Sequence, residues 1–186
     1  MNFLIEYIKH PRKIGAVAPS GNSLARKMII PVDFNSAKVI VEYGSGTGSF
    51  TRELVVRRKP DTVLILIEQN RKFCSELEKT FCNQQNLYII NGSAENVNDY
   101  LNEHGFKTAD YIVSGLPFTS LPANISDNIL NATKIALGKK GKFITFQYSL
   151  VKKKFFEKYF RICDCLRELK NLPPAYVLVM RNRKIS

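Results

Sequence analysis

The stretch that decides the fold runs from Val39 to Phe50 and reads Val-Ile-Val-Glu-Tyr-Gly-Ser-Gly-Thr-Gly-Ser-Phe. It opens with a β-branched run, which is the pattern of a buried strand. Three glycines then alternate through a turn, and Ser49 or Thr51 can cap a helix that follows. Glycine permits positive φ and close approach of a ligand, and a helix N-terminus offers unpaired N–H groups. The stretch therefore predicts a nucleotide-binding corner, although any tight strand-to-helix turn can require glycine.

A second apolar run, Val63–Ile67, ends in the acidic residue Glu68. An acid about 20 positions beyond the glycine turn, at the end of the next strand, can accept both hydroxyls of a ribose. The glycine spacing is Gly-x-Gly-x-Gly, preceded by Glu42, and not the dinucleotide pattern Gly-x-Gly-x-x-Gly. This form resembles the S-adenosylmethionine (SAM) site of class I methyltransferases, and it favours SAM over NAD.

The bulk properties limit the class of protein. The chain has 186 residues, of which 45% are hydrophobic, so we expect one folded domain over residues 1–186. No apolar run approaches the ~20 residues of a membrane-spanning helix, and no signal peptide is visible, which predicts a cytoplasmic protein. The four cysteines form no Cys-x-x-Cys pair and no Cys/His cluster, so we expect no metal site.

Positive charge is concentrated at both ends of the chain. The formal net charge is +12, of which residues 1–30 carry +4, residues 139–186 carry +10 and the middle carries −2. A basic surface attracts phosphate, whether in nucleic acid or in anionic lipid. A solvated lysine-rich face that keeps the protein soluble is the alternative interpretation.

The first thirty residues predict two short helices around a basic segment. On a helix over residues 2–9, one face carries Phe3, Leu4, Tyr7 and Ile8. An apolar-aromatic face beside a basic cluster suits a helix that lies in a membrane interface, although docking on its own domain fits equally well. A second helical stripe follows at residues 24–29, with Gly21–Asn22 as its cap. We interpret residues 1–30 as a helical cap that contacts the membrane.

The rest of the chain alternates strand and helix signals, which is typical of an α/β fold. We expect helices over residues 50–58, 71–82, 97–103 and 124–137, the last ended by Gly138. We expect further strands over residues 62–67, 87–90, 109–113 and 142–147. The strand-like segments 161–169 and 175–181 predict a closing hairpin with Pro173-Pro174 in its turn.

Four stretches together resemble the bacterial phospholipid N-methyltransferases. They are residues 8–20 (Ile-Lys-His-Pro-Arg-Lys-Ile-Gly-Ala-Val-Ala-Pro-Ser), the loop Glu42–Gly48, the loop Ser114–Phe118 and the segment Asn171–Tyr176. The resemblance implies a Rossmann-like, mostly parallel sheet of seven strands with an antiparallel last strand and helices on both faces. It also implies SAM as methyl donor, with S-adenosyl-L-homocysteine as product, and methylation of the amine of phosphatidylethanolamine.

The resemblance also indicates which residues hold the cofactor. Glu42 would orient the glycine loop near the methionine part of SAM. In many class I methyltransferases an acid after the third strand accepts the adenine amino group, and the matching position here is Ser93, with Glu95 as a substitute. The predicted cofactor-binding residues are Glu42, Tyr43, Gly44, Ser45, Gly46, Thr47, Gly48, Glu68, Gln69, Gly92, Ser93, Ala94 and Ser114.

The acceptor amine is expected beside the loop after strand four, because an open α/β sheet binds ligands where its strand order reverses. Backbone carbonyls near Ser114–Leu116 would orient the amine, and aromatic ring faces would stabilise the developing ammonium. The predicted catalytic residues are Ser114, Gly115, Leu116, Pro117, Phe118, Tyr7 and Tyr176. No His, Asp or Glu stands out as an obligatory base.

The family is related to the rRNA adenine N6-dimethyltransferases, which carry Asn-Ile/Leu-Pro-Tyr/Phe after strand four. There the Asn and a backbone carbonyl accept hydrogen bonds from the adenine amino group, and the aromatic residue stacks on the flipped base. This sequence has Gly115 in place of that Asn. The difference favours a lipid acceptor over a base, although Ser114 or the backbone can compensate.

We therefore predict a monomeric SAM-dependent N-methyltransferase that acts on phosphatidylethanolamine-type lipids. It would sit on the anionic inner face of the cell membrane through its N-terminal helix and basic ends. The first alternative is an rRNA adenine N6-methyltransferase whose basic ends hold RNA. A second is a SAM-binding adaptor without transfer activity, and a small amine as acceptor is also open.

Overall fold

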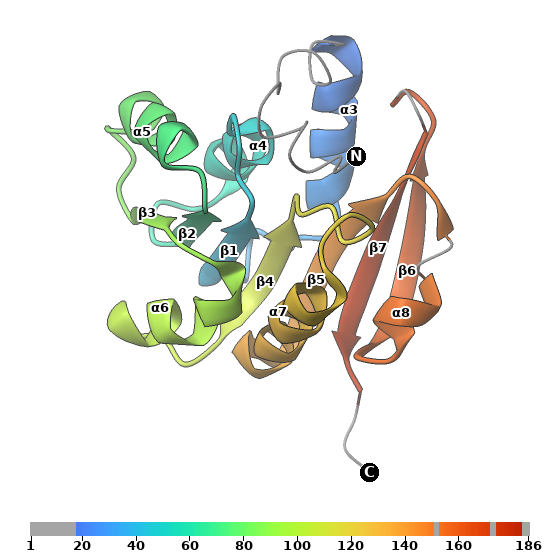
Figure 1. Ribbon diagram of the computed structural model, residues 1–186. Helices are drawn as coiled ribbons and strands as arrows, with labels where there is room; N and C mark the ends of the chain where they lie inside the picture. Colours follow the sequence, from blue (N-terminus) through green and yellow to red (C-terminus); the bar gives the residue numbers. More distant parts are fainter. Residues whose placement is uncertain (1–17, 151–152, 172–173, 184–186) are drawn as a thin grey trace.

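The computed structural model describes residues 18–150, 153–171 and 174–183, and it consists of one central sheet with helices on both sides (Figure 1). The helices are α3 (Ala18–Ile29), α4 (Ser49–Arg57), α5 (Arg71–Thr80), the 3-10 helix η1 (Ala94–Asn96), α6 (Val97–Glu103), α7 (Ala123–Ala136) and α8 (Lys153–Glu157). The strands are β1 (Val39–Tyr43), β2 (Val63–Glu68), β3 (Leu87–Asn91), β4 (Ala109–Ser114), β5 (Leu137–Gln147), β6 (Phe160–Glu168) and β7 (Ala175–Asn182).

The sheet has seven strands in the order β3-β2-β1-β4-β5-β7-β6. Strands β1 to β5 are parallel, whereas β7 runs antiparallel to both of its neighbours. The order reverses between β1 and β4, so the ends of these two strands meet at the point where open α/β sheets bind ligands. The predicted fold class is therefore confirmed, including the antiparallel last strand.

Two apolar cores cover the two faces of the sheet. One core joins the sheet to α3, α4 and α5 through residues such as Met28, Leu54 and Leu77. The other joins it to α6, α7 and α8 through residues such as Leu101 and Leu130. Strands β1 and β2 are buried along their whole length, which explains their β-branched and aliphatic runs, Val39–Val41 and Val63–Ile67.

Two predicted boundaries are wrong, and each has a local reason. Helix α3 begins at Ala18, so Gly21 and Asn22 lie inside it and do not cap it. Pro19 lies in the first turn of this helix. Proline is tolerated there, because the N–H that it lacks would have no partner. Strand β5 begins at Leu137, directly after α7, since Leu137 pairs with Ala109 of β4. Gly138 therefore lies in the strand and does not terminate the helix. The predicted helix over residues 2–9 lies outside the described residues.

Candidate active site

The glycine turn joins β1 to α4 in a conformation that requires glycine. Gly44, Gly46 and Gly48 have φ of 64°, 52° and 80°, in the left-handed region that side chains disfavour. The N–H of Gly44 donates to the carbonyl of Ile67 at 2.8 Å, which fixes the turn to the end of β2. The predicted strand–turn–helix corner is therefore present, with the three glycines at its bends.

Glu68 places its carboxylate against the glycine turn. Its Oε2 accepts the backbone N–H of Gly46 at 2.9 Å, and its Oε1 accepts the N–H of Asn70 at 2.8 Å. The residue is 9% exposed, so the acid is held in one position at the carboxyl end of β2. This is the location that a ribose-binding acid requires, next to the turn that approaches the cofactor. The neighbouring Gln69 is exposed, and its carbonyl accepts a hydrogen bond from Asn91.

Glu42 is fully buried at the end of β1, and only one of its two carboxylate oxygens has a hydrogen-bond partner. Its Oε2 accepts the hydroxyl of Thr51 at 2.8 Å, while its Oε1 and the hydroxyl of the buried Ser45 have no hydrogen-bond partner. Burial raises the pKa of Glu42 to about 8, opposed by the Thr51 hydrogen bond and reinforced by Glu68. A buried acceptor oxygen without a donor fits a ligand that brings an N–H group, such as the amino group of SAM.

The loop after β4 packs directly on the glycine turn. The N–H of Gly115 donates to the carbonyl of Tyr43 at 2.8 Å, and the Thr145 hydroxyl donates to the carbonyl of Ser114 at 3.3 Å. A Cβ on Gly115 would lie 2.9 Å from the Gly44 carbonyl oxygen. A Cβ on Gly44 would lie 2.8 Å from the side chain of Leu116. The two loops thus leave no room for a side chain where they meet.

Of the aromatic residues predicted beside the acceptor, the two that the structure describes, Phe118 and Tyr176, are not brought together. Phe118 is fully buried, and its ring makes edge contacts with Phe143 and Phe156 at centroid distances of 6.1 and 5.4 Å. It supports the core, and its ring face does not line the surface of the loop, contrary to the prediction from the sequence. Tyr176 opens β7 opposite Gln147, with the Arg167 guanidinium 5.8 Å from its ring centroid. Two strand spacings therefore separate it from β4.

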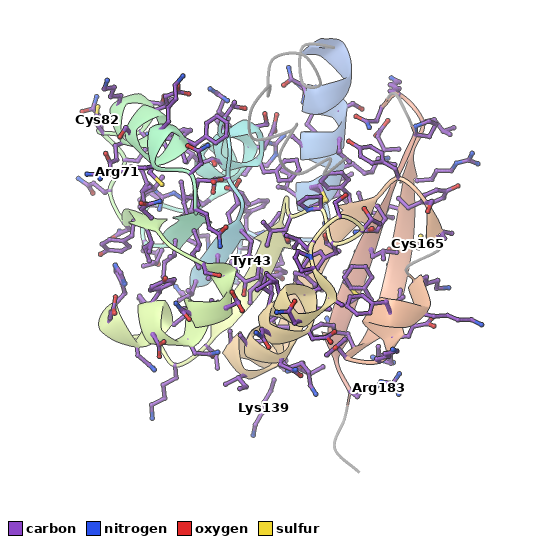
Figure 2. All side chains as sticks on the ribbon, viewed as in Figure 1. Tyr43, Arg71, Cys82, Lys139, Cys165 and Arg183 are labelled. Atoms are coloured by element: carbon purple, nitrogen blue, oxygen red, sulfur yellow. The ribbon has the colours of Figure 1, made fainter. Side chains whose placement is uncertain are left out.

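Tyr7, the third predicted aromatic residue, lies outside the described residues. Tyr43, which we assigned to the cofactor, is fully buried in the middle of the sheet (Figure 2), and its hydroxyl lies 3.2 Å from that of Thr133. Its side chain is a core element, and only its backbone carbonyl reaches the loop after β4. Thr47 is exposed, and its carbonyl accepts a hydrogen bond from Arg52.

The segment after β3 forms the third side of the site. The N–H of Gly92 donates to the carbonyl of Glu68 at 3.1 Å, so this segment lies beside the ribose-type acid. Ser93 caps η1, and its hydroxyl lies 3.0 Å from Oε2 of Glu95. The two candidate adenine acceptors therefore bind each other, and Ala94 is buried beneath them.

Phe50 and Tyr100 also shape the site, although neither is among the site residues predicted from the sequence. A Cβ on Gly115 would lie 3.5 Å from the ring of Phe50, so this ring borders the loop after β4. The ring of Phe50 also packs edge-on against Phe146. A Cβ on Gly92 would meet the Tyr100 hydroxyl, so Tyr100 closes the site below β3. Phe50 directly follows the glycine turn, which is a usable signal, whereas Tyr100 sits on a separate helix and gave none.

The reversal between β1 and β4, the positive-φ glycine turn and the two acids Glu42 and Glu68 define a class I SAM-dependent methyltransferase. The chain is 32% identical over 186 residues to a curated ornithine lipid N-methyltransferase from Singulisphaera acidiphila, with 99% of this chain and 96% of that protein covered. It belongs to the family of that enzyme, and it is a SAM-dependent N-methyltransferase. No family model matches the chain.

Solved structures with the same fold are far more distant in sequence. A Burkholderia thailandensis 1,6-didemethyltoxoflavin-N1-methyltransferase with bound S-adenosylhomocysteine has a TM-score of 0.75 at 9% identity, covering 97% of this chain and 86% of that one. The N-methyltransferase NodS from Bradyrhizobium japonicum WM9, in complex with S-adenosyl-L-homocysteine, has a TM-score of 0.67 at 11% identity, covering 88% and 86%. The likeness supports the fold. The relation to rRNA adenine dimethyltransferases has no support from these proteins and stays a prediction.

Proposed function

We propose that this enzyme methylates the free aliphatic amine of a membrane lipid. The observation that carries the proposal is the contact between Gly115 and the glycine turn. A side chain at position 115 would begin 2.9 Å from a backbone oxygen, so the position accepts glycine alone unless the backbone moves. The Asn that orients adenine in the rRNA enzymes cannot be placed here, and the fully buried Phe118 offers no face on which a base can stack.

The proposed transfer requires little acid–base chemistry from the protein. SAM supplies a methyl group on a sulfonium, which an amine attacks in line. The chain's own task is to orient a deprotonated amine and to exclude water. The backbone of the Ser114–Leu116 loop offers carbonyl acceptors for the amine hydrogens beside the glycine turn. Glu42 and Glu68 are accounted for by the cofactor, so we assign no side chain as a base.

The curated relative and the family resemblance of the sequence indicate two different lipids, but both lipids carry an aliphatic amine. The curated relative is named for ornithine lipid, whereas the resemblance of the sequence indicates phosphatidylethanolamine. Both lipids present an aliphatic amine at the membrane surface. We therefore propose the lipid amine as the substrate class, and both lipids belong in the assay.

A lipid acceptor implies contact with the membrane at the edge of the sheet that holds the site. Tyr148 and Leu150 follow the end of β5, Leu169 follows the end of β6, and they are 48%, 39% and 61% exposed. Both strands pair antiparallel with β7, so both end at the same edge as β1 and β4. Lys170 lies next to Leu169, and Lys153 begins α8 soon after Leu150. Apolar side chains beside lysines suit an anionic membrane surface.

No helix among the described residues is long and apolar enough to cross a membrane. The exposed side chains of Tyr148, Leu150 and Leu169 support peripheral binding, which we propose and to which the predicted helix at residues 2–9 would add.

Transfer of labelled methyl from SAM tests the proposal. The purified protein is offered vesicles containing ornithine lipid, vesicles containing phosphatidylethanolamine, and unmodified ribosomal RNA. Label in either lipid supports the proposal and identifies the head group. Label in RNA alone would overturn it.

A Gly115→Asn variant sharpens this test. We expect it to lose lipid methylation without gaining RNA methylation, because the side chain displaces the glycine turn. Circular dichroism and SAM binding show whether the variant still folds. A variant that keeps full lipid activity would contradict the steric argument.

A further inference from the structure

Three cations stand side by side on neighbouring strands in the half of the sheet away from the glycine turn. Arg161 of β6 lies directly opposite Arg181 of β7. Met180 of β7 lies opposite Phe143 of β5, so Arg181 and Lys142 are the next residues along their strands. Side chains opposite each other in a ladder point to the same face. Lys142, Arg181 and Arg161 therefore form a row across three strands, on the face that carries α3.

The row lines a hollow in the protein surface of about 440 Å³. The residues Ile30 and Pro31, just after α3, form one wall, and β6, the edge strand of the sheet (Figure 1), forms the other. Arg161 is exposed and Arg181 is half-buried, so both guanidinium groups are accessible. The full lining is Ile30, Pro31, Lys142, Arg161, Ile162, Cys163, Asp164, Leu166, Val179 and Arg181.

The three cations lie near two acids but form an ion pair with neither in the described part of the chain. None of the ion pairs within residues 18–150, 153–171 and 174–183 includes any of the three. Lys142 donates one hydrogen bond to the Pro31 carbonyl at 2.9 Å and lies 5.8 Å from the Tyr111 ring centroid. The carboxylate of Asp164 accepts the N–H of Cys165 at 2.8 Å. Hydrogen bonds from the Ser36 hydroxyl and the Asn35 N–H lower the pKa of Asp33, and the nearby Lys142 adds a smaller effect. These two acids leave a net positive hollow.

Such a row is destabilising unless an anion occupies it. Like charges directly opposite in a ladder repel each other. A phosphate group supplies several acceptor oxygens, and arginine binds it through two parallel N–H donors. Two guanidinium groups and an ammonium around one hollow supply the positive charge and the hydrogen-bond donors that a phosphate group requires.

We propose that this hollow is a binding site for a phosphate-class anion, separate from the methyl-transfer site. Lys142 lies opposite Tyr111, three residues before Ser114 along the strands, which is roughly 10 Å from the edge that holds the glycine turn. The row also lies on β5, β7 and β6, beyond the strands that form the cofactor site. The anion is either a soluble phosphate ester or the phosphate of a lipid head group.

Calorimetric titration with inorganic phosphate tests the site, with chloride holding the ionic strength constant. We expect binding to the wild type, and about tenfold weaker binding to Arg181→Gln, because a charge-assisted hydrogen bond is lost. The double variant Arg161→Gln/Arg181→Gln should show no binding. Lys79→Gln, which removes an exposed cation from α5, should bind phosphate as the wild type does.

Thermal unfolding supplies a second readout. Phosphate should raise the melting temperature of the wild type and of Lys79→Gln, but not that of the double variant. Without phosphate the double variant should be at least as stable as the wild type, because like-charge repulsion is removed. Equal phosphate binding by the wild type and the double variant, or no binding by the wild type, would overturn the proposal.

Vesicles distinguish the two sources of phosphate. The probe is an equal mixture of phosphatidylcholine and phosphatidic acid, compared with phosphatidylcholine alone. If the double variant loses co-sedimentation relative to Lys79→Gln, the ligand is a lipid head group. If both variants sediment equally while the double variant still fails to bind inorganic phosphate, the ligand is a soluble phosphate ester. A failure of lipid methylation would leave both results interpretable, since neither assay measures transfer.

Discussion

Glu42 combines complete burial with one unpaired carboxylate oxygen, next to the glycine turn that the sequence assigns to the cofactor. A carboxylate in this environment is costly to ionise, and its pKa rises to about 8. The same residue can thus be neutral in the free protein and become an acceptor for an amino group when a ligand arrives. Residue-scale tests can separate these two roles.

The free energy of unfolding should depend on pH through Glu42. Between its ordinary pKa of 4.5 and about 8, the folded protein holds a proton that the unfolded chain releases. The free energy of unfolding is therefore highest, as far as Glu42 is concerned, below this pH window. It falls as the pH rises through the window, by up to about 1.4 kcal/mol per pH unit. Denaturant unfolding of Glu42→Gln should show a shallower slope, while the exposed Glu78→Gln keeps that of the wild type. Identical slopes for all three proteins would contradict a raised pKa of Glu42 in the folded protein.

The contact between Glu68 and the glycine turn predicts a charge effect at position 46. A Cβ on Gly46 meets no atom within 4 Å, and Asp and Asn both tolerate positive φ. Gly46→Asp, however, adds a negative charge beside a carboxylate that already lies 2.9 Å from the backbone nitrogen. Calorimetry should show SAM affinity falling at least about tenfold more in Gly46→Asp than in Gly46→Asn. Unchanged affinity in the Asp variant would contradict the cofactor assignment.

At the scale of elements, helix α5 links Glu68, the predicted ribose-binding acid, to the core. Asn70 caps this helix, and its side-chain oxygen accepts the N–H groups of Lys72 and Phe73 at 3.0 and 3.4 Å. The backbone N–H of Asn70 also holds Glu68. The cap thus sets where the helix begins and where the acid points.

Removing this cap should lower stability while preserving the fold. Asn70→Ala should cost about 1 kcal/mol in chemical denaturation, because two helix N–H groups lose their acceptor. Asn70→Ser keeps a capping oxygen and should lose markedly less. Equal losses in the two variants would show that the side chain does not act as a cap.

The sequence predicts elements well where the periodicity is strong and less well at their ends. The buried strands β1 and β2 and the amphipathic helix α5 were located within a few residues, because long apolar runs and a four-residue spacing leave few alternatives. The start of β5 was missed because pairing with β4, and not local propensity, extends it to Leu137. Phe118 was assigned to the site because motif position shows adjacency along the chain, whereas its burial comes from β5 and α8. The steric role of Gly115 depends on contact with Gly44, which no single sequence reveals.

At the scale of the whole molecule, large apolar residues are exposed at several places on the surface. Tyr148, Leu150 and Leu169 gather at the edge of the sheet that holds the site. Ile135 is 70% exposed in the last turn of α7, which leads into the opposite end of β5. Leu169 and Ile135 are both exposed aliphatic residues and lie toward opposite ends of the sheet, which makes them suitable for a comparison.

Leu169→Asp should weaken co-sedimentation with anionic vesicles by about tenfold, since a buried aliphatic side chain contributes about 1.5 kcal/mol or more. Ile135→Asp should sediment as the wild type does. Methylation of a soluble amine analogue should be unchanged in both variants, which separates docking from transfer. Equal vesicle binding by both variants would contradict membrane contact at this edge.

The position of β7 between β5 and β6 constrains the order in which the molecule can be completed during synthesis. Residues 160–168 leave the ribosome before residues 175–182, yet they have no strand to pair with until the later segment arrives. Until then the open side of β5, with its unpaired backbone groups, is available to chaperones or to other nascent chains. A chain truncated before residue 175 should therefore be captured by such partners, and the 186-residue chain should escape them. The emergence of a single strand would thus be the checkpoint between a vulnerable nascent chain and a closed sheet.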